Sequence, residues 1–119
     1  MSVICASATL AAAGTPQSIS AATAPSLPAM IMGGRTYPAG SATPRVYQLM
    51  AQADPSNTGA NIYLGGPQMV KGTRANVGAV LPKTAAPISL GQYGGAFALT
   101  DLFFDGDTTG DKVLLMLVG

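Results

Sequence analysis

The chain has 119 residues, the length of one ordinary domain, and its formal net charge is +1. Only 9% of the residues are charged, so the chain has no long-range field to gather nucleic acid, acidic substrates or anionic lipid. His, Glu and Trp are absent, and without His most nucleophile–base pairs and most first-row metal sites cannot be built. The composition therefore predicts a protein that is not an enzyme and that holds no cofactor.

The small number of charged residues also limits which side chains can form the surface. Soluble domains usually carry about a quarter charged residues, so this chain must expose mainly small and neutral polar side chains. Such surfaces are typical of proteins largely covered by other subunits, and also of rigid extracellular β-proteins. We expect a homo-oligomer, a dimer or trimer, or an assembly component. The single cysteine, Cys5, excludes an internal disulfide framework and is expected to be a small buried apolar residue.

The first part of the chain gives weak structural signals. Residues 1–14 are apolar and end in small residues, but no Lys or Arg precedes the apolar run, so a signal peptide is not expected. No apolar run approaches the ~20 residues that a membrane span requires. Residues 2–10 alternate loosely between apolar and small polar types and predict a first strand. Residues 17–22 are a weaker strand candidate.

Residues 23–44 differ in composition from the rest. Prolines and glycines recur through this segment, which excludes a regular helix and makes long central strands unfavourable. The apolar run at Met30–Met32 leaves three interpretations open: a loop that plugs the domain's own core, an extended arm that lies on a neighbouring protein, or a disordered segment. The arm interpretation predicts a partner interface at Met30, Ile31, Met32, Arg35 and Tyr37.

The segment 45–66, RVYQLMAQADPSNTGANIYLGG, predicts strand, turn and strand. Residues 54–59 supply what a tight reversal needs. Pro55 has a preset φ, Asn57 and Gly59 tolerate positive φ, and Asp54 can bond nearby backbone N–H groups. Gly65-Gly66-Pro67 is expected to stop the second strand.

Strand and turn signals then alternate to the end of the chain, and no segment keeps a 3.6-residue period. This rhythm predicts one all-β domain over residues 1–119, an antiparallel β-sandwich of jelly-roll type with an irregular Pro/Gly-rich arm at 23–44. Residues 112–118 are almost all apolar, which indicates a strand covered on both faces, either at the centre of the sandwich or at a subunit interface. The strands expected after residue 44 are 45–52, 60–64, 67–71, 76–81, 87–90, 96–104 and 112–118.

Few residues suggest chemistry. Asp105–Asp111 resembles the start of a calcium loop, but its twelfth position is Met116 instead of a bidentate Glu. We therefore predict a hairpin turn between strands 96–104 and 112–118, and no metal site. The pairs Gly65-Gly66 and Gly94-Gly95 fit no phosphate-binding pattern and are expected to form turns or bulges. The methionines at positions 30, 32, 50 and 69 are expected to fill the core or an interface.

The second half of the chain resembles a known family. The runs VYQLMAQADPSNTGANIYLGG, NVGAVLPKTAAPISL and LTDLFFDGDTTGDKVLLMLVG follow one another in the order seen in small structural proteins of tailed bacteriophages. The matching parts cover residues 45–119, and residues 1–44 lie outside the resemblance. The pattern is one of strands and turns and includes no chemical signature. Its parts are Asn61–Gly66, Leu81–Leu90, Asp101–Gly106 and Lys112–Val118.

The resemblance implies a function without catalysis. Proteins of this kind are capsid decoration (cement) proteins, head fibres or tail-associated modules. We expect a decoration protein on the capsid exterior of a virion that binds the major capsid protein and stabilises the assembled head, with no nucleic acid or membrane partner. The alternative is a head-fibre or tail-associated module that contacts the host surface. A carbohydrate-binding domain is a third interpretation, and the low aromatic content counts against it.

Overall fold

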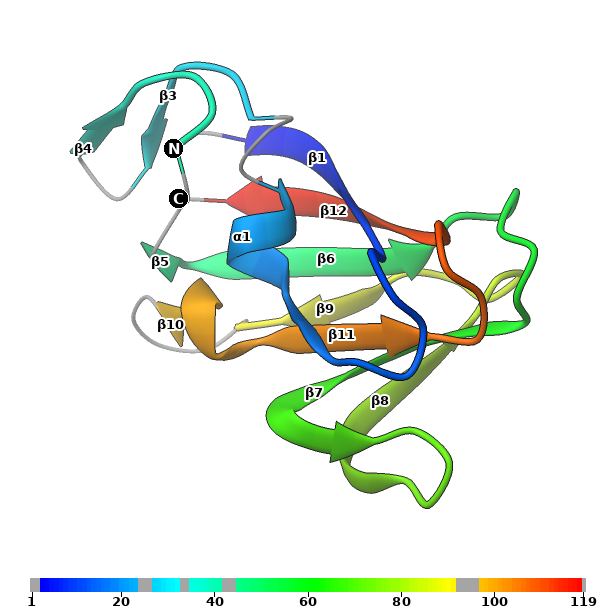
Figure 1. Ribbon diagram of the computed structural model, residues 1–119. Coiled ribbons are helices and arrows are strands. Elements are labelled where there is room, and N and C mark those ends of the chain that lie inside the picture. Colours follow the sequence, from blue (N-terminus) through cyan, green and yellow to red (C-terminus); the bar gives the residue numbers. More distant parts are fainter. Residues whose placement is uncertain (1–2, 24–26, 33–34, 42–44, 92–96, 119) are drawn as a thin grey trace.

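Two antiparallel four-stranded sheets face each other in the computed structural model, which describes residues 3–23, 27–32, 35–41, 45–91 and 97–118 (Figure 1). In the first sheet, β12 and β6 are central, and β1 and β9 form the edges. The strands of this sheet, in order across it, are β1 (Val3–Thr9), β12 (Lys112–Val118), β6 (Gln48–Ala53) and β9 (Ile88–Leu90).

The second sheet contains the longest strand, β7, next to β11. The strands of this sheet, in order across it, are β2 (Gln17–Ser18), β11 (Phe103–Gly106), β7 (Asn61–Val70) and β8 (Ala75–Pro82). Two short ladders complete the structure. One joins β3 (Met30–Met32) to β4 (Arg35–Tyr37), and the other joins β5 (Arg45–Val46) to β10 (Phe97–Ala98).

The strand pairing is that of a jelly roll. The strand β1 pairs with the last strand β12, β2 pairs with β11, β6 pairs with β9, and β7 pairs with β8. A long antiparallel hairpin that folds over on itself produces this order, because each strand of its first half then lies beside its partner from the second half. The predicted all-β, jelly-roll-like sandwich is confirmed.

The core lies between the sheets and follows the period of two expected for strands with one buried face. In β6, Leu49, Ala51 and Ala53 are buried and the residues between them are not. Val113, Leu115 and Leu117 alternate in the same way in β12. The largest fully buried side chains are Phe104, Leu10, Ile19, Leu49, Ile62, Leu99 and Leu117.

Four predicted strand boundaries are wrong. Residues 45–52 are divided between β5 and β6, which belong to different sheets. Residues 60–64 and 67–71 form one strand, because a bulge at Gly65 lets β7 continue past the point where it was expected to stop. A Cβ at Gly65 would collide with the Asn76 carbonyl oxygen, so glycine is required there. Residues 96–104 are divided by the 3₁₀ turn η2 (Leu99–Asp101). Residues 17–22 form only two strand residues, followed by the short helix α1 (Ile19–Thr23). The pair Gly94-Gly95 lies outside the described residues.

The segment 23–44 contains the β3–β4 hairpin, which projects from one end of the sandwich (Figure 1). Ile31 is 57% exposed, so it does not plug the domain's own core. Leu27 is buried there instead, and Tyr37 packs against the core cluster. The structure does not describe the side chains of Met30 and Met32.

Candidate interaction surfaces

The acidic residues near the end of the chain bind backbone N–H groups of neighbouring loops. Asp105 is buried, and its Oδ1 accepts hydrogen bonds from the backbone N–H groups of Gly14 (2.9 Å) and Gly106 (2.7 Å). Asp111 is also buried, and its two carboxylate oxygens accept from the N–H groups of Thr58 (3.0 Å) and Gly59 (2.9 Å). Charged acceptors satisfy buried donors strongly, so these side chains hold the loops in place.

The other polar side chains of these loops complete the network. Asp107 accepts from the N–H of Asn61 (3.1 Å) and from the Tyr63 hydroxyl (3.0 Å). The Asn57 amide donates to the Lys112 carbonyl oxygen and accepts from the Lys112 N–H, both at 2.8 Å. Three loops that are distant in the sequence are thereby joined. We call this region, residues 10–16, 54–60 and 107–111, the loop end.

The loops cross between the sheets, which corrects the predicted hairpin turn. The strand β11 belongs to the second sheet and β12 to the first, and Asp105 and Gly106 are still part of β11. Asn57 and Gly59 were expected in this turn because they tolerate a positive φ. That reason is wrong, since neither residue has a positive φ. Gly59 is needed for space: an added Cβ would collide with the Asp111 carboxylate.

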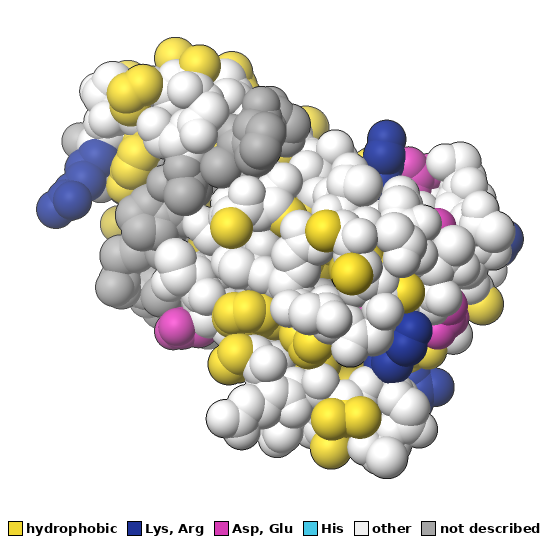
Figure 2. All heavy atoms as spheres, viewed as in Figure 1, with side chains coloured by type: hydrophobic (Ala, Val, Ile, Leu, Met, Phe, Trp, Pro, Cys, Tyr) yellow, Lys and Arg dark blue, Asp and Glu magenta, His cyan; other side chains and the backbone are white. Residues whose placement is uncertain are grey.

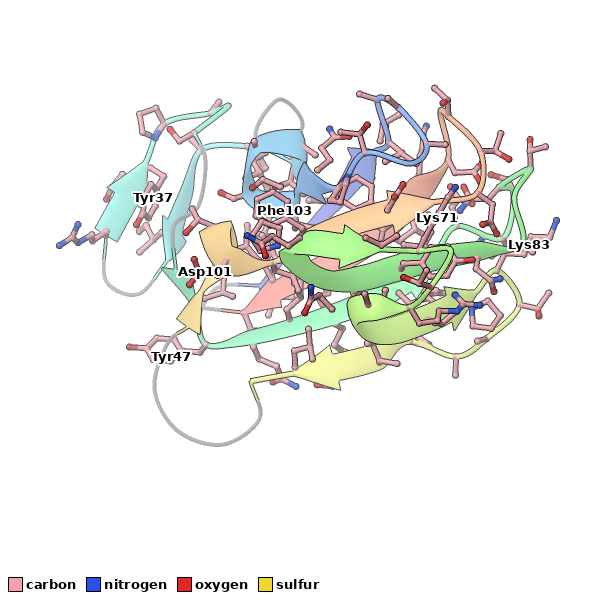
Figure 3. All side chains as sticks on the ribbon, turned by 60° about the horizontal axis from the view of Figure 1, so that its bottom comes forward. Tyr37, Tyr47, Lys71, Lys83, Asp101 and Phe103 are labelled. Atoms are coloured by element: carbon pink, nitrogen blue, oxygen red, sulfur yellow. The ribbon has the colours of Figure 1, made fainter. Side chains whose placement is uncertain are left out.

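The cations near this end also bind neutral partners. Lys71 Nζ donates to the Gly106 carbonyl oxygen (2.6 Å) and Lys83 Nζ to the Asn57 carbonyl oxygen (3.2 Å), and Figure 3 shows both lysines toward the loop end. The Arg74 guanidinium lies 4.7 Å from the Tyr63 ring centre. Hydrogen bonds from the Ser56 N–H and hydroxyl lower the pKa of the half-buried Asp54.

No group of three or more potential metal ligands gathers among the described residues. Every buried side-chain nitrogen or oxygen in the described part of the chain has a hydrogen-bond partner, so none points unpaired into a cavity. The polar residues of the loop end therefore act on the chain's own backbone.

The outer face of the first sheet has a different composition. Adjacent strands bring Cys5, Met116, Met50 and Ser89 into one row across the sheet. The row on one side contains Ser7, Leu114 and Gln52, and the row on the other contains Val3, Val118 and Gln48. None of these residues is charged. We call the surface formed by these three rows the outer face.

A shallow groove of about 320 Å³ runs over the outer face. It is lined by Cys5, Ala6, Met50, Ala51, Gln52, Pro87, Leu114, Leu115 and Met116. Cys5 is exposed here, contrary to the prediction that it is buried. Because strand residues alternate between the two faces, β12 turns Val113, Leu115 and Leu117 to the core and leaves Leu114, Met116 and Val118 on the outside. The described residues therefore cover only one side of this apolar strand.

The second candidate surface is the β3–β4 hairpin. In the register of this hairpin, Ile31 lies opposite Thr36 and Met30 lies opposite Tyr37. Directly opposed residues share a face, so Ile31 and Thr36 point to one side and Tyr37 to the other. Ile31, Thr36 and Arg35 are exposed, whereas Tyr37, which is labelled in Figure 3, is half-buried. Of the predicted interface residues, Ile31 and Arg35 are available to a partner, and Tyr37 anchors the hairpin to the sandwich.

Few charges interrupt the surface seen in Figure 2, and most of them lie on its right side. The exposed large apolar side chains among the described residues include Val3 and Met116 on the outer face and Ile31 on the hairpin. Tyr47, Val70 and Val80 are exposed elsewhere. Of these surfaces, the outer face had a sequence signal, the unbroken apolar run of β12. No sequence signal indicates the groove on this face, because Cys5, Met50 and Met116 are far apart in the sequence.

No protein-family model matches the chain, and no curated protein or solved structure matches it either. Within the part of the chain that the structure describes, no helix is long and apolar enough to cross a membrane. The functional argument therefore depends on the surfaces described above.

Proposed function

We propose that this chain is a structural subunit that acts by binding other proteins and not by catalysis. The observation that supports this most directly is the outer side of β12, where Leu114, Met116 and Val118 lie in the middle of a sheet face and the charged side chain of this strand, Lys112, lies at its end. A contiguous exposed apolar patch of this kind marks a protein-binding surface. The small number of charged side chains fits a protein whose exterior is covered by neighbours.

The specific form of this proposal is a bacteriophage capsid decoration protein that binds the outside of the assembled head as an oligomer. It rests on the resemblance of residues 45–119 to small virion proteins, and the jelly-roll topology is compatible with it, since this topology occurs in capsid domains. A protein that binds only the assembled shell stabilises it by RT ln(1 + [L]/Kd) per site. Several weak contacts in one oligomer add by avidity.

The alternative is a head-fibre or tail-associated module, which would use the same surfaces for self-association and contact the host at a free end. Jelly rolls also occur in lectin domains, so topology alone does not separate these functions. Copy number does. Hundreds of copies per particle support decoration, whereas a dozen or fewer support a fibre or tail component.

Co-sedimentation with capsids tests the proposal. The purified chain is added to virions stripped of it, and saturable binding at a fixed ratio to the major capsid protein is expected. Met116→Lys places a charge on the outer face and should reduce binding at least tenfold, because a charge in an apolar contact is costly. Val80→Lys is the matched control, since Val80 is 39% exposed and Met116 37%, and it lies on the second sheet. Failure of the wild-type chain to bind, or equal loss in both folded variants, would contradict the proposal.

A further inference from the structure

We propose that a crevice between the edge strands of the two sheets binds a small apolar molecule, the size of one aromatic ring or a short branched alkane. The crevice has a volume of about 140 Å³. It lies between Leu64 and Ala79 of the second sheet and Ile88 and Leu90 of the first, and we call it the edge crevice. It shares no lining residue with the groove on the outer face, so this inference does not depend on the proposed function.

Both sheets turn aliphatic side chains into the edge crevice. In the second sheet, Ala79 of β8 lies opposite Leu64 of β7, which is buried in the core. In the first sheet, Ile88 and Leu90 of β9 lie opposite buried residues of β6. Directly opposed residues share a face, so these side chains point into the space between the sheets. The strands β8 and β9 are the edge strands on the same side of the sandwich (Figure 1), and the crevice therefore opens there.

The bulge in the β7–β8 ladder keeps this space open. The register shifts between Leu64 and Gly65, and Gly78 has no opposite residue in β7. Gly65 and Gly78 both line the crevice and carry no side chain to fill it. A Cβ at Gly65 would collide with the Asn76 carbonyl oxygen, so no larger residue can occupy that wall. The backbone path at the bulge therefore produces the empty volume.

The lining determines the chemical class of the ligand. Its residues are leucine, isoleucine, alanine and glycine, so no hydroxyl, amide or charged side chain faces the crevice. Water in a cavity needs about two to four polar partners, which these side chains do not supply. An apolar molecule would displace weakly held water and remove apolar surface from water on both sides of the contact. A polar group on the ligand would lose its hydrogen bonds to water without replacement.

The volume determines the size of the ligand. An aliphatic cavity of about 150 Å³ stays dry and binds benzene or xenon, so a volume of about 140 Å³ is enough for one small ring. Ala79, Ile88, Leu90 and Leu102 line the crevice and are only half-buried, so the ligand can enter from the edge without unfolding of the core. A stable protein interface buries roughly 800 Å² on each partner. A crevice of this size is therefore suited to a small molecule and not to a protein surface.

Titration of the full chain with benzene tests the site, and methyl chemical shifts in NMR spectra locate the bound ligand. Benzene should bind saturably and shift the methyl signals of Leu64, Ile88 and Leu90. Phenol, the same ring with a hydroxyl group, should bind at least tenfold more weakly. Ala79→Leu fills the crevice and should weaken benzene binding at least tenfold. Ala75→Leu is the matched control at an exposed position of the same strand, and it should change the affinity less than twofold.

Leu102→Ala gives a second test that does not depend on blocking the site. The backbone at this position is held by the hydrogen bonds from the Leu102 N–H to the Leu99 carbonyl oxygen (3.1 Å) and from the Ile19 N–H to the Leu102 carbonyl oxygen (3.0 Å). Removal of the side chain enlarges the crevice, so the affinity for p-xylene relative to benzene should rise at least tenfold.

Several results would overturn the edge crevice as a binding site. These are no saturable binding of benzene to the wild-type chain, equal affinities for benzene and phenol, equal losses in Ala79→Leu and Ala75→Leu, or an unchanged p-xylene preference in Leu102→Ala. Methyl shifts confined to Leu114 and Met116 would place the ligand in the groove on the outer face instead. Capsid binding is measured without these ligands, so any of these results leaves the proposed function intact.

Discussion

The loop end and the β3–β4 hairpin lie in different parts of the molecule and are stabilised in different ways. At the loop end, Asp105, Asp107 and Asp111 each accept hydrogen bonds from residues more than 40 positions away, so connections between the two sheets are fixed by directional bonds. The hairpin is attached by apolar packing of Tyr37 and by the backbone hydrogen bond from the Gly40 N–H to the Leu27 carbonyl oxygen. The first region satisfies its own polar groups, whereas the second leaves apolar surface exposed.

This comparison separates folding from binding in the chain. Four of the five acidic residues lie in or beside the loop end and bond within the chain, so charge is used mainly to hold the fold. The surfaces that remain exposed on the outer face and at Ile31 are mainly apolar, and in our proposal a partner protein buries them. Three predictions test the difference, in order of expected effect.

Removal of the Asp111 carboxylate should have the largest effect on stability. Asp111→Ala leaves the partly buried N–H group of Thr58 and the buried N–H group of Gly59 without their acceptors. Each hydrogen bond to a charged group is worth about 1.5–3 kcal/mol, so unfolding should become easier by about 3 kcal/mol or more. Denaturant unfolding measures the change, and Asp101→Ala, at an exposed position, is the control with a change below about 0.5 kcal/mol. Equal effects at both positions would contradict a structural role for the Asp111 contacts.

Substitutions at Leu27, which precedes the hairpin, and at Ile31, in the middle of β3, should have different effects on stability. Leu27 is buried in the core cluster, so Leu27→Ala should lower the free energy of unfolding by about 2–4 kcal/mol. Ile31→Lys should change it by less than about 0.5 kcal/mol, because this side chain is exposed. The same Ile31→Lys change should weaken self-association at least tenfold in analytical ultracentrifugation. An Ile31→Lys variant that unfolds would show that Ile31 serves the chain's own core.

Calcium should have the smallest effect. The carboxylate oxygens of Asp105, Asp107 and Asp111 already accept hydrogen bonds from the protein. Met116, at the twelfth position of the calcium-loop pattern, lies on the outer face and offers no carboxylate. Millimolar calcium or a chelator should therefore leave the melting temperature within about 1 °C. A calcium-dependent rise of several degrees would mean that the loop end exchanges its hydrogen bonds for a metal ion, and the comparison would then need revision.

The sequence by itself determined the all-β class, the sandwich and most strand positions. Alternation in residues 48–53 and the apolar run at 112–118 both reflect a local period of two, which depends only on backbone geometry. The turn at 54–59 was also predictable, because Asp54 bonds Ser56 two residues away. These features depend on contacts between near neighbours in the chain.

The tertiary structure alone decided the features that depend on distant partners. Gly59 is required because Asp111 occupies the space beside it, and Gly65 is required because the Asn76 carbonyl oxygen approaches it at the bulge in β7. The sequence could indicate that β12 needed cover on both faces. Only the pairing of β12 with β1 and β6 placed Cys5, Met116 and Met50 in one row on the outer face. Pairing between strands far apart in sequence is set by the fold as a whole, so no local pattern reveals which side chains will meet.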